Sequence, residues 1–227
     1  MIGIIGAMPE EIEALLELLS HKEETQKGPF TLHRGILEGK NVMIAKCGIS
    51  KVNAAALTQI MIVEGVHKVI FTGVAGGLEP DMKVGDIVIS SDCVQHDVDV
   101  TALGYALGHI PGESFSWSAD KELHDAALTA ANSISQVKVY SGRVLSGDVF
   151  LESAEKVAWL RETFKGSCAE MEGASVAQIC SKWQIPFVII RSISDVGNES
   201  SKMDFREFTP LAAERAKQVV EGMLKGL

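Results

Sequence analysis

The sequence contains few cysteines, and none of them form a pair with the spacing of a redox or zinc site. Its four cysteines, Cys47, Cys93, Cys168 and Cys180, are far apart and lie in or beside apolar runs. This pattern is typical of buried thiols in a reducing compartment. We therefore expect a cytoplasmic protein that has neither disulfides nor a metal centre.

Long hydrophobic runs and an excess of positive charge are absent as well. No apolar run approaches the roughly 20 residues that a membrane-spanning helix needs. Residues 1–6 lack the basic flank of a signal peptide and read as a first strand. The formal net charge of −9 argues against nucleic acid or an anionic membrane as the main partner. We expect neither partner for this chain.

The apolar content is sufficient for one full core. With 227 residues and 46% hydrophobic residues, residues 1–227 are expected to form a single domain. Strand-like apolar runs alternate with amphipathic segments, which predicts an α/β protein. The expected strands are residues 2–5, 30–37, 42–46, 68–72, 86–90, 137–144 and 187–190. The expected helices are residues 10–19, 51–64, 121–131, 154–163, 171–183 and 211–224. The hairpin pattern over residues 30–46 favours a mixed sheet.

Acidic residues gather at three places that follow predicted strands. Glu11 lies at the turn into the first helix, Glu170 and Glu172 open another helix, and Asp195 follows the apolar run 186–190. Each has a simple structural explanation, because acids complement a helix dipole and aspartate caps turns. However, open α/β sheets bind ligands beyond the carboxyl ends of their strands. Three such clusters together favour acid–base chemistry or the binding of hydroxyl groups.

The turn at Glu11 does not suit a phosphate group. It lacks a G-x-G-x-x-G run and offers no Arg or Lys, so a carboxylate there would repel phosphate and could deprotonate water. Glycine-rich segments at residues 73–77 and 146–150 read as turns that let the backbone approach a ligand closely. Phe150 either stacks on a flat base or packs in the core, and its position does not decide between the two.

The stretch from residue 96 to residue 118 reads as a long loop rich in Gly, Pro and aromatic residues. Loops of this length in a compact domain are mostly functional or take part in assembly. Leu103, Tyr105 and Phe115 are among the side chains that are too apolar to leave in water. We therefore expect the apolar side chains of this loop to be buried against another part of the assembled protein.

Taken together, the motifs resemble the 5'-methylthioadenosine/S-adenosylhomocysteine nucleosidases, a branch of the nucleoside phosphorylase/hydrolase family. The matching segments are IGIIGAMPEE, GVAGGL, KVGDIV, HDVDVTALGY, IPG, LSGDVF, AEMEGAS and RSISDVG, in this order along nearly the whole chain. The resemblance implies a three-layer α/β/α sandwich with a mixed, twisted central sheet, and a homodimer. It also implies irreversible hydrolysis of the N-ribosidic bond to adenine, with a small-molecule nucleoside as substrate and no cofactor.

The resemblance further implies roles for single residues. Glu11 would activate water, and Asp195 would protonate adenine. Glu172 would hold the ribose hydroxyls beside Met171, and Arg191 would order carboxylates and water from behind. The other expected substrate contacts are Met8, Ile49, Ala75, Gly76, Val100, Phe150, Leu151, Glu170, Ser194 and Phe205. The neighbouring subunit is expected to contribute Leu103, Tyr105 and Pro111.

Two positions depart from the family pattern and leave the substrate open. Val74 stands where many members have a Ser that orients the catalytic acid, so Asp195 must be supported by Ser194, backbone or water. Leu103 replaces a commonly aromatic residue at the rim of the pocket. The substrate is thus methylthioadenosine, adenosylhomocysteine or 6-amino-6-deoxyfutalosine of menaquinone synthesis. A purine nucleoside phosphorylase and a non-catalytic nucleoside-binding protein are the alternatives.

Overall fold

The central sheet consists of strands that are mostly longer than the sequence predicted. The computed structural model describes residues 1–196 and 201–227, except for the side chains of residues 202 and 203, so Gly197 of the RSISDVG motif lies outside it. The strands are β1 (Ile2–Gly6), β2 (Ser20–Lys27), β3 (Phe30–Leu37), β4 (Lys40–Lys46), β5 (Lys68–Gly77), β6 (Ile87–Gln95), β7 (Trp117–Ser118), β8 (Val139–Ser146), β9 (Gly166–Glu170) and β10 (Phe187–Asp195).

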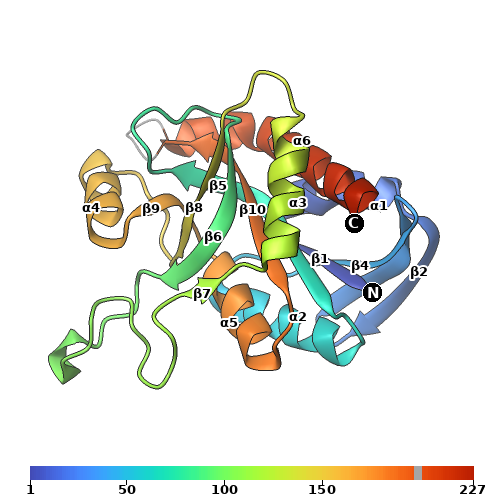
Figure 1. Cartoon of the computed structure of the whole chain (residues 1–227), viewed down its shortest axis with the longest axis horizontal. Coiled ribbons are helices and arrows are strands. Elements are labelled where there is room, and N and C mark those ends of the chain that lie inside the picture. The colour runs from blue at the N-terminus through green and yellow to red at the C-terminus, as the bar shows by residue number, and fades with distance from the viewer. Residues whose placement is uncertain (197–200) are drawn as a thin grey trace.

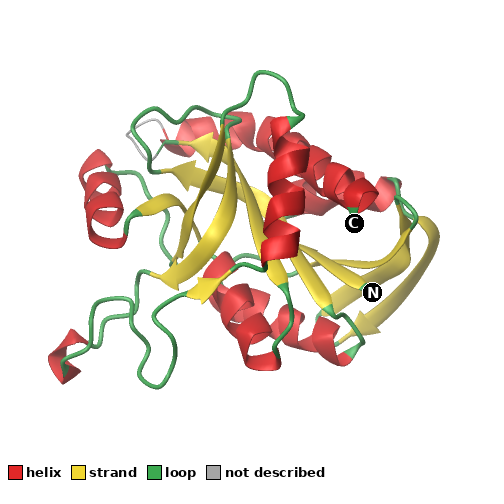
Figure 2. Ribbon diagram, in the orientation of Figure 1, coloured by secondary structure: helices red, strands yellow, loops and turns green. Residues whose placement is uncertain are grey.

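Helices cover both faces of this sheet (Figures 1 and 2). They are α1 (Pro9–Glu17), α2 (Lys51–Val63), α3 (Lys121–Asn132), α4 (Ala154–Phe164), α5 (Gly173–Trp183) and α6 (Ser201–Gly226). Asp120 and Ser153 cap α3 and α4 with their side chains. Within the described ranges, no helix is both long enough and apolar enough to cross a membrane.

The sheet is mixed, and one half of it closes on itself. β1 runs parallel to β4 on one side and to β5 on the other, and the β2–β3–β4 hairpins extend that edge. β5 pairs with both β9 and β10, and the path from β10 through β6 and β8 returns to β9. This closure brings the carboxyl-terminal ends of β5, β8 and β10 together with β9.

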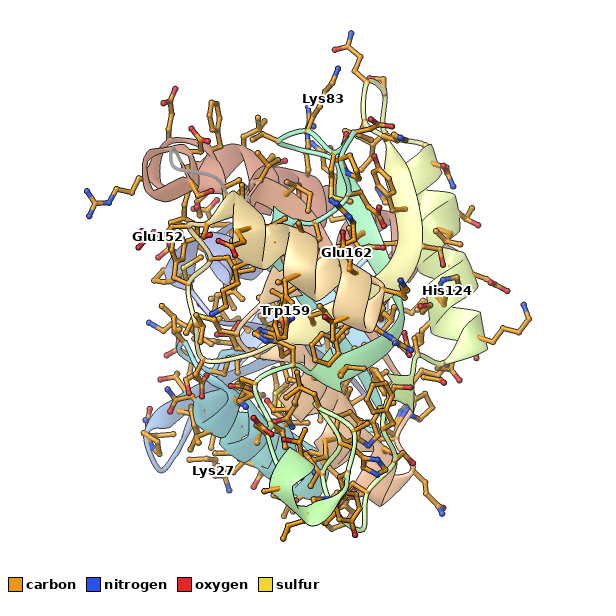
Figure 3. The ribbon with its side chains drawn as sticks, turned by 90° about the vertical axis from the view of Figure 1, so that its left-hand side faces the viewer. Lys27, Lys83, His124, Glu152, Trp159 and Glu162 are labelled. Atoms are coloured by element: carbon orange, nitrogen blue, oxygen red, sulfur yellow. The ribbon has the colours of Figure 1, made fainter. Side chains whose placement is uncertain are left out.

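Successive residues of the buried strands face different helix layers, because side chains alternate along a strand. Ile4 and Ile70 pack with α1, α3 and α6, whereas Ile5 and Phe71 pack with α2 and α5. Both faces are buried, which explains the continuous apolar runs in the sequence. The predicted α/β/α layering is confirmed. Figure 3 shows α4, with Trp159 and Glu162 along it, in front of the closed half of the sheet.

The prediction of a turn at residues 73–77 is wrong, as is the prediction that the last strand ends at residue 190. β5 continues through Gly77, and β10 continues to Asp195, because β10 pairs with β5 as far as Gly76 and β9 pairs with the last two residues of β5. The glycines allow these crowded backbones to approach one another. The acid at position 195 is therefore the last residue of a buried strand rather than part of a loop.

Other elements differ from the prediction as well, since β2, β7 and β9 were not among the expected strands. β2 was missed because its sequence, SHKEETQK, is almost entirely polar, which is typical of an edge strand. α6 begins at Ser201 instead of residue 211 and runs across Pro210. A proline inside a helix removes one backbone hydrogen bond, but this helix packs against β5 and β10, and that burial maintains it.

Candidate active site

A cavity of about 190 Å³ opens where the closed half of the sheet meets the start of α1. Most of the predicted site residues line it, namely Met8, Glu11, Ile49, Ala75, Gly76, Phe150, Leu151, Glu170, Met171, Glu172, Ser194, Asp195 and Phe205. Val74 lines it as well, and the sequence did not predict that Ala7, Val149 and Ala169 do. Small apolar residues such as these carry no signal for a binding site.

Glu11 lies in the first turn of α1, and its carboxylate is folded back onto the backbone. Its Oε2 accepts hydrogen bonds from the amides of Ala7 (2.5 Å) and Met8 (2.9 Å), and its Oε1 accepts one from the amide of Val74 (3.0 Å). Burial raises the pKa of Glu11, and the charge of Arg191 and the three amides offset this only in part. The carboxylate is thus fixed in place and more basic than in water, which suits the removal of a proton.

Two glycines of β5 give the acidic residues room. A Cβ atom on Gly73 would lie 2.4 Å from Oε1 of Glu11 and 2.6 Å from Nη1 of Arg191, and one on Gly76 would lie 3.3 Å from Oδ1 of Asp195. Three residues of strand span roughly 10 Å. Glu11 and Asp195 therefore contact different parts of β5, with space for a reacting molecule between them.

The carboxyl group of Asp195 is supported by its neighbour in sequence, one of the three sources expected for this support. The hydroxyl of Ser194 donates to Oδ2 of Asp195 at 3.1 Å. The side chain of Val74 packs against Ala212 and Ala213 of α6, while its amide holds Glu11. Position 74 therefore holds the carboxylate of Glu11 through its backbone amide, and Ser194 holds the carboxyl group of Asp195 through its hydroxyl.

The oxygens of Glu170 are occupied by protein donors. They accept from Nη2 of Arg191 (2.5 Å), from the amides of Glu172 (3.2 Å) and Gly173 (2.7 Å), and from the hydroxyl of Ser146. Glu170 thus neutralises Arg191 and caps the start of α5. Glu170 also borders the cavity, so the expected substrate contact stays a prediction.

Glu172 is less constrained than Glu170. Its Oε1 accepts from the amide of Ser50 at 2.8 Å. Burial and, after it, the charge of Glu170 raise the pKa of Glu172 to about 8. Ser50 itself has φ +99°, a region that L-residues rarely adopt and that is concentrated at functional sites. No feature of the sequence indicated this contact of Ser50.

Arg191 lies behind the cavity, as predicted. Its guanidinium is fully buried, lies 4.0 Å from the centre of the Phe71 ring and pairs with Glu170. Its Nε and Nη1 have no hydrogen-bond partner among the described residues. Among those residues, no group of three or more His, Cys, Asp or Glu side chains is arranged to hold a metal ion.

The predicted rim residues do not line the cavity of this single chain. Val100, Leu103, Tyr105 and Pro111 belong to the segment between β6 and β7, which projects away from the sheet (green, lower left in Figure 1). Leu103 is 72% exposed there. Val100 was expected to line the cavity of its own chain and lies outside it, because the chain turns outward after β6.

Comparison with known proteins identifies the family. The sequence model of the phosphorylase superfamily matches residues 1–225. The chain belongs to the phosphorylase superfamily. Within this superfamily, a relative from Anoxybacillus flavithermus named 5'-methylthioadenosine/S-adenosylhomocysteine nucleosidase is 41% identical, over all of this chain and 98% of its own length. The predicted resemblance to that nucleosidase family is confirmed.

Solved structures of superfamily members agree with this assignment. The 5'-methylthioadenosine/S-adenosylhomocysteine nucleosidase of Neisseria meningitidis, in complex with methylthio-immucillin-A, superposes with a TM-score of 0.96 at 41% identity, covering 100% of this chain and 99% of that one. The native futalosine hydrolase of Helicobacter pylori superposes with a TM-score of 0.95 at 38% identity, covering 100% and 97%.

Proposed function

We propose that this chain hydrolyses the N-ribosidic bond of 5'-substituted adenine nucleosides to adenine and the free pentose derivative. The observation that carries the proposal is the placement of Glu11 over Gly73 and of Asp195 beside Gly76, with the cavity between them. The names of the similar proteins support it, since they are nucleosidases and a futalosine hydrolase.

The chemistry follows from what each carboxyl group would do. Breaking the bond between ribose and base leaves positive charge on the sugar and negative charge on adenine. Asp195 would give its proton to the leaving base, and Glu11 would take a proton from the attacking water, as the two carboxyl groups of an inverting glycosidase do. Glu172 would accept hydrogen bonds from the ribose hydroxyls.

The apolar residues of the cavity would position the two ends of the substrate. Phe150 and Leu151 would contact adenine, and Met8, Ile49, Met171 and Phe205 would surround the ribose and its 5'-substituent. The rings of Phe150 and Phe205 pack edge to face, with their centroids 5.8 Å apart. This contact connects the base-binding segment to α6.

Water is a better nucleophile for this site than phosphate. Glu11 lines the cavity, and in the ionised form that a base must have, its carboxylate repels a phosphate dianion. The positive charge of Arg191 is already paired with Glu170. A protein that only binds nucleosides would need neither a base nor an acid, so the pair Glu11 and Asp195 favours an enzyme.

A panel of nucleosides tests the proposed function. We expect adenine release from methylthioadenosine, adenosylhomocysteine and 6-amino-6-deoxyfutalosine, and slower release from adenosine. Adenosine lacks a 5'-substituent to contact Met8 and Phe205, and remote contacts contribute to catalysis. Inosine serves as the control for the base. The proposal fails if none of the adenine nucleosides releases adenine.

We also propose that two copies of the chain form a homodimer and that each completes the cavity of the other. The exposed apolar residues Leu103 and Tyr105 support this, because they project from the body of the chain and need a cover. A two-fold axis would carry each loop to the neighbouring site.

Replacing Tyr105 tests the shared cavity. Tyr105→Ala is expected to raise KM for adenosylhomocysteine several-fold, by roughly 1 kcal/mol of lost contact, and to leave KM for adenosine nearly unchanged. The steady-state constants for both substrates are measured side by side, and sedimentation at the assay concentration gives the state of assembly. A monomer with full activity would contradict the shared cavity.

A further inference from the structure

Three polar residues outside the cavity connect two of its walls. Lys51 is the first residue of α2, Asp97 follows β6 closely, and Asp148 follows β8 closely. Asp97 accepts hydrogen bonds from Nζ of Lys51 (2.6 Å) and from the amide of Asp148 (3.0 Å), and Oδ1 of Asp148 accepts one from the amide of Lys51 (3.0 Å). These three residues, which we call the clamp, form a closed ring of hydrogen bonds.

Two residues of the clamp, Lys51 and Asp148, lie next to residues that contact or line the cavity. The residue before Lys51 is Ser50, whose strained backbone presents its amide to Glu172 at 2.8 Å. Two residues after Asp148 comes Phe150, which lines the cavity from the other side. The clamp therefore fixes the separation between the carboxylate expected to hold ribose and the ring expected to contact the base.

Neighbouring contacts hold the clamp in one arrangement. A Cβ on Gly147 would lie 2.4 Å from the ring of His96, so the segment before Asp148 is packed tightly against the residue that follows β6. Nζ of Lys51 also donates to Oε1 of Gln95 at 3.1 Å. Burial alone would raise the pKa of Asp97, but the hydrogen bonds from Lys51 and Asp148 outweigh it and leave that pKa below its ordinary value. Asp97 is thus charged at neutral pH and accepts with both oxygens.

We propose that Lys51, Asp97 and Asp148 are positioning residues for nucleoside hydrolysis. They hold Ser50 and Phe150 at a fixed separation. The groups that bind the ribose and the group that contacts the base are then correctly spaced for one nucleoside. This inference rests on the proposed function. It assigns the clamp to the binding of substrate, and it predicts that loosening the clamp weakens binding more than it slows the chemical step.

Substitutions of the two clamp aspartates, graded by the hydrogen bonds that each removes, test the clamp. Asp148→Asn keeps a carbonyl oxygen for the amide of Lys51, so KM for methylthioadenosine should rise far less than in Asp148→Ala. Asp97→Asn must turn an NH₂ group toward one of the two donors that Asp97 accepts from, so one hydrogen bond to a charged group is lost. Asp148→Ala loses the hydrogen bond from the amide of Lys51. In both variants KM should rise by about tenfold. These contacts are partly exposed, so the fold should persist.

The readout separates positioning from a merely structural role. A variant that is partly unfolded has fewer active molecules, which lowers the apparent kcat at unchanged KM, whereas a loosened clamp raises KM. Circular dichroism and thermal unfolding give the folded fraction of each variant. Unchanged KM in both Asp97→Asn and Asp148→Ala, with an active wild type, would overturn the clamp alone. A wild type that releases no adenine would overturn the proposed function and the clamp with it.

Discussion

Asp195→Asn is expected to lower kcat for adenine release by about 10²–10⁴-fold, the usual contribution of a general acid. Asparagine has almost the same shape as aspartic acid, and its carbonyl oxygen can still accept the hydrogen bond from Ser194. It has no acidic proton to give to the departing base. Because only the proton is lost, binding of adenine should change little. Single-turnover release of adenine measures the chemical step directly.

Ser194→Ala is the matched control for this variant. It removes the hydroxyl that supports Asp195 and leaves the acid itself in place, so it should cost far less activity than Asp195→Asn. A folded Asp195→Asn protein with a rate near that of the wild type would show that Asp195 is not the acid. Failure of Asp195→Asn to fold would indicate a structural role at the end of β10.

The second large effect is expected for Glu11→Gln, which should lower kcat/KM by about 10²–10⁴-fold because the base that activates water is lost. Glutamine also places an NH₂ group among the amides of Ala7, Met8 and Val74, all of which donate. One donor must then lose its acceptor. We therefore expect Glu11→Gln to have a lower melting temperature than the wild type as well as a lower kcat/KM.

The prediction for Glu11 also fixes the direction in which kcat/KM changes with pH. Burial raises the pKa of Glu11, so wild-type kcat/KM should fall at low pH as Glu11 takes up a proton, beginning at a higher pH than for an ordinary glutamate. The residual activity of Glu11→Gln should lack this decline. Glu10→Gln is the matched control, since Glu10 is the exposed neighbour and should keep near wild-type activity. A Glu11→Gln profile that still shows the wild-type decline would assign the base to another group.

The elements that position Glu11 could be predicted from the sequence because their signals are local. An apolar run followed by Pro9 and an amphipathic stripe fixes the end of β1 and the start of α1, and Glu11 follows from that boundary. The burial of both faces of β1 and β5 likewise follows from runs that are apolar throughout. The family resemblance added the roles of the residues, which composition and spacing could not supply.

The other features depend on contacts between distant parts of the chain. Residues 73–77 form a strand only because β9 and β10 pair with them, and their glycines read locally as a turn. Glu170 and Glu172 flank Met171 symmetrically in sequence. Only the position of Arg191 shows that Glu170 is paired with a buried cation, whereas Glu172 accepts from the amide of Ser50. The contact of Ser50 and the clamp join residues that are separated by up to 122 positions, and no local pattern predicts such pairs.

The most direct test of the central claim, that Glu11 activates water at this site, is the identity of the sugar product as phosphate is increased. Methylthioadenosine is incubated with the wild-type protein over a range of phosphate concentrations, and adenine and the sugar are quantified by mass spectrometry. We expect adenine and free methylthio-pentose in equal amounts, at a rate that does not depend on phosphate. A pentose 1-phosphate, formed at a rate that rises with phosphate, would contradict the claim.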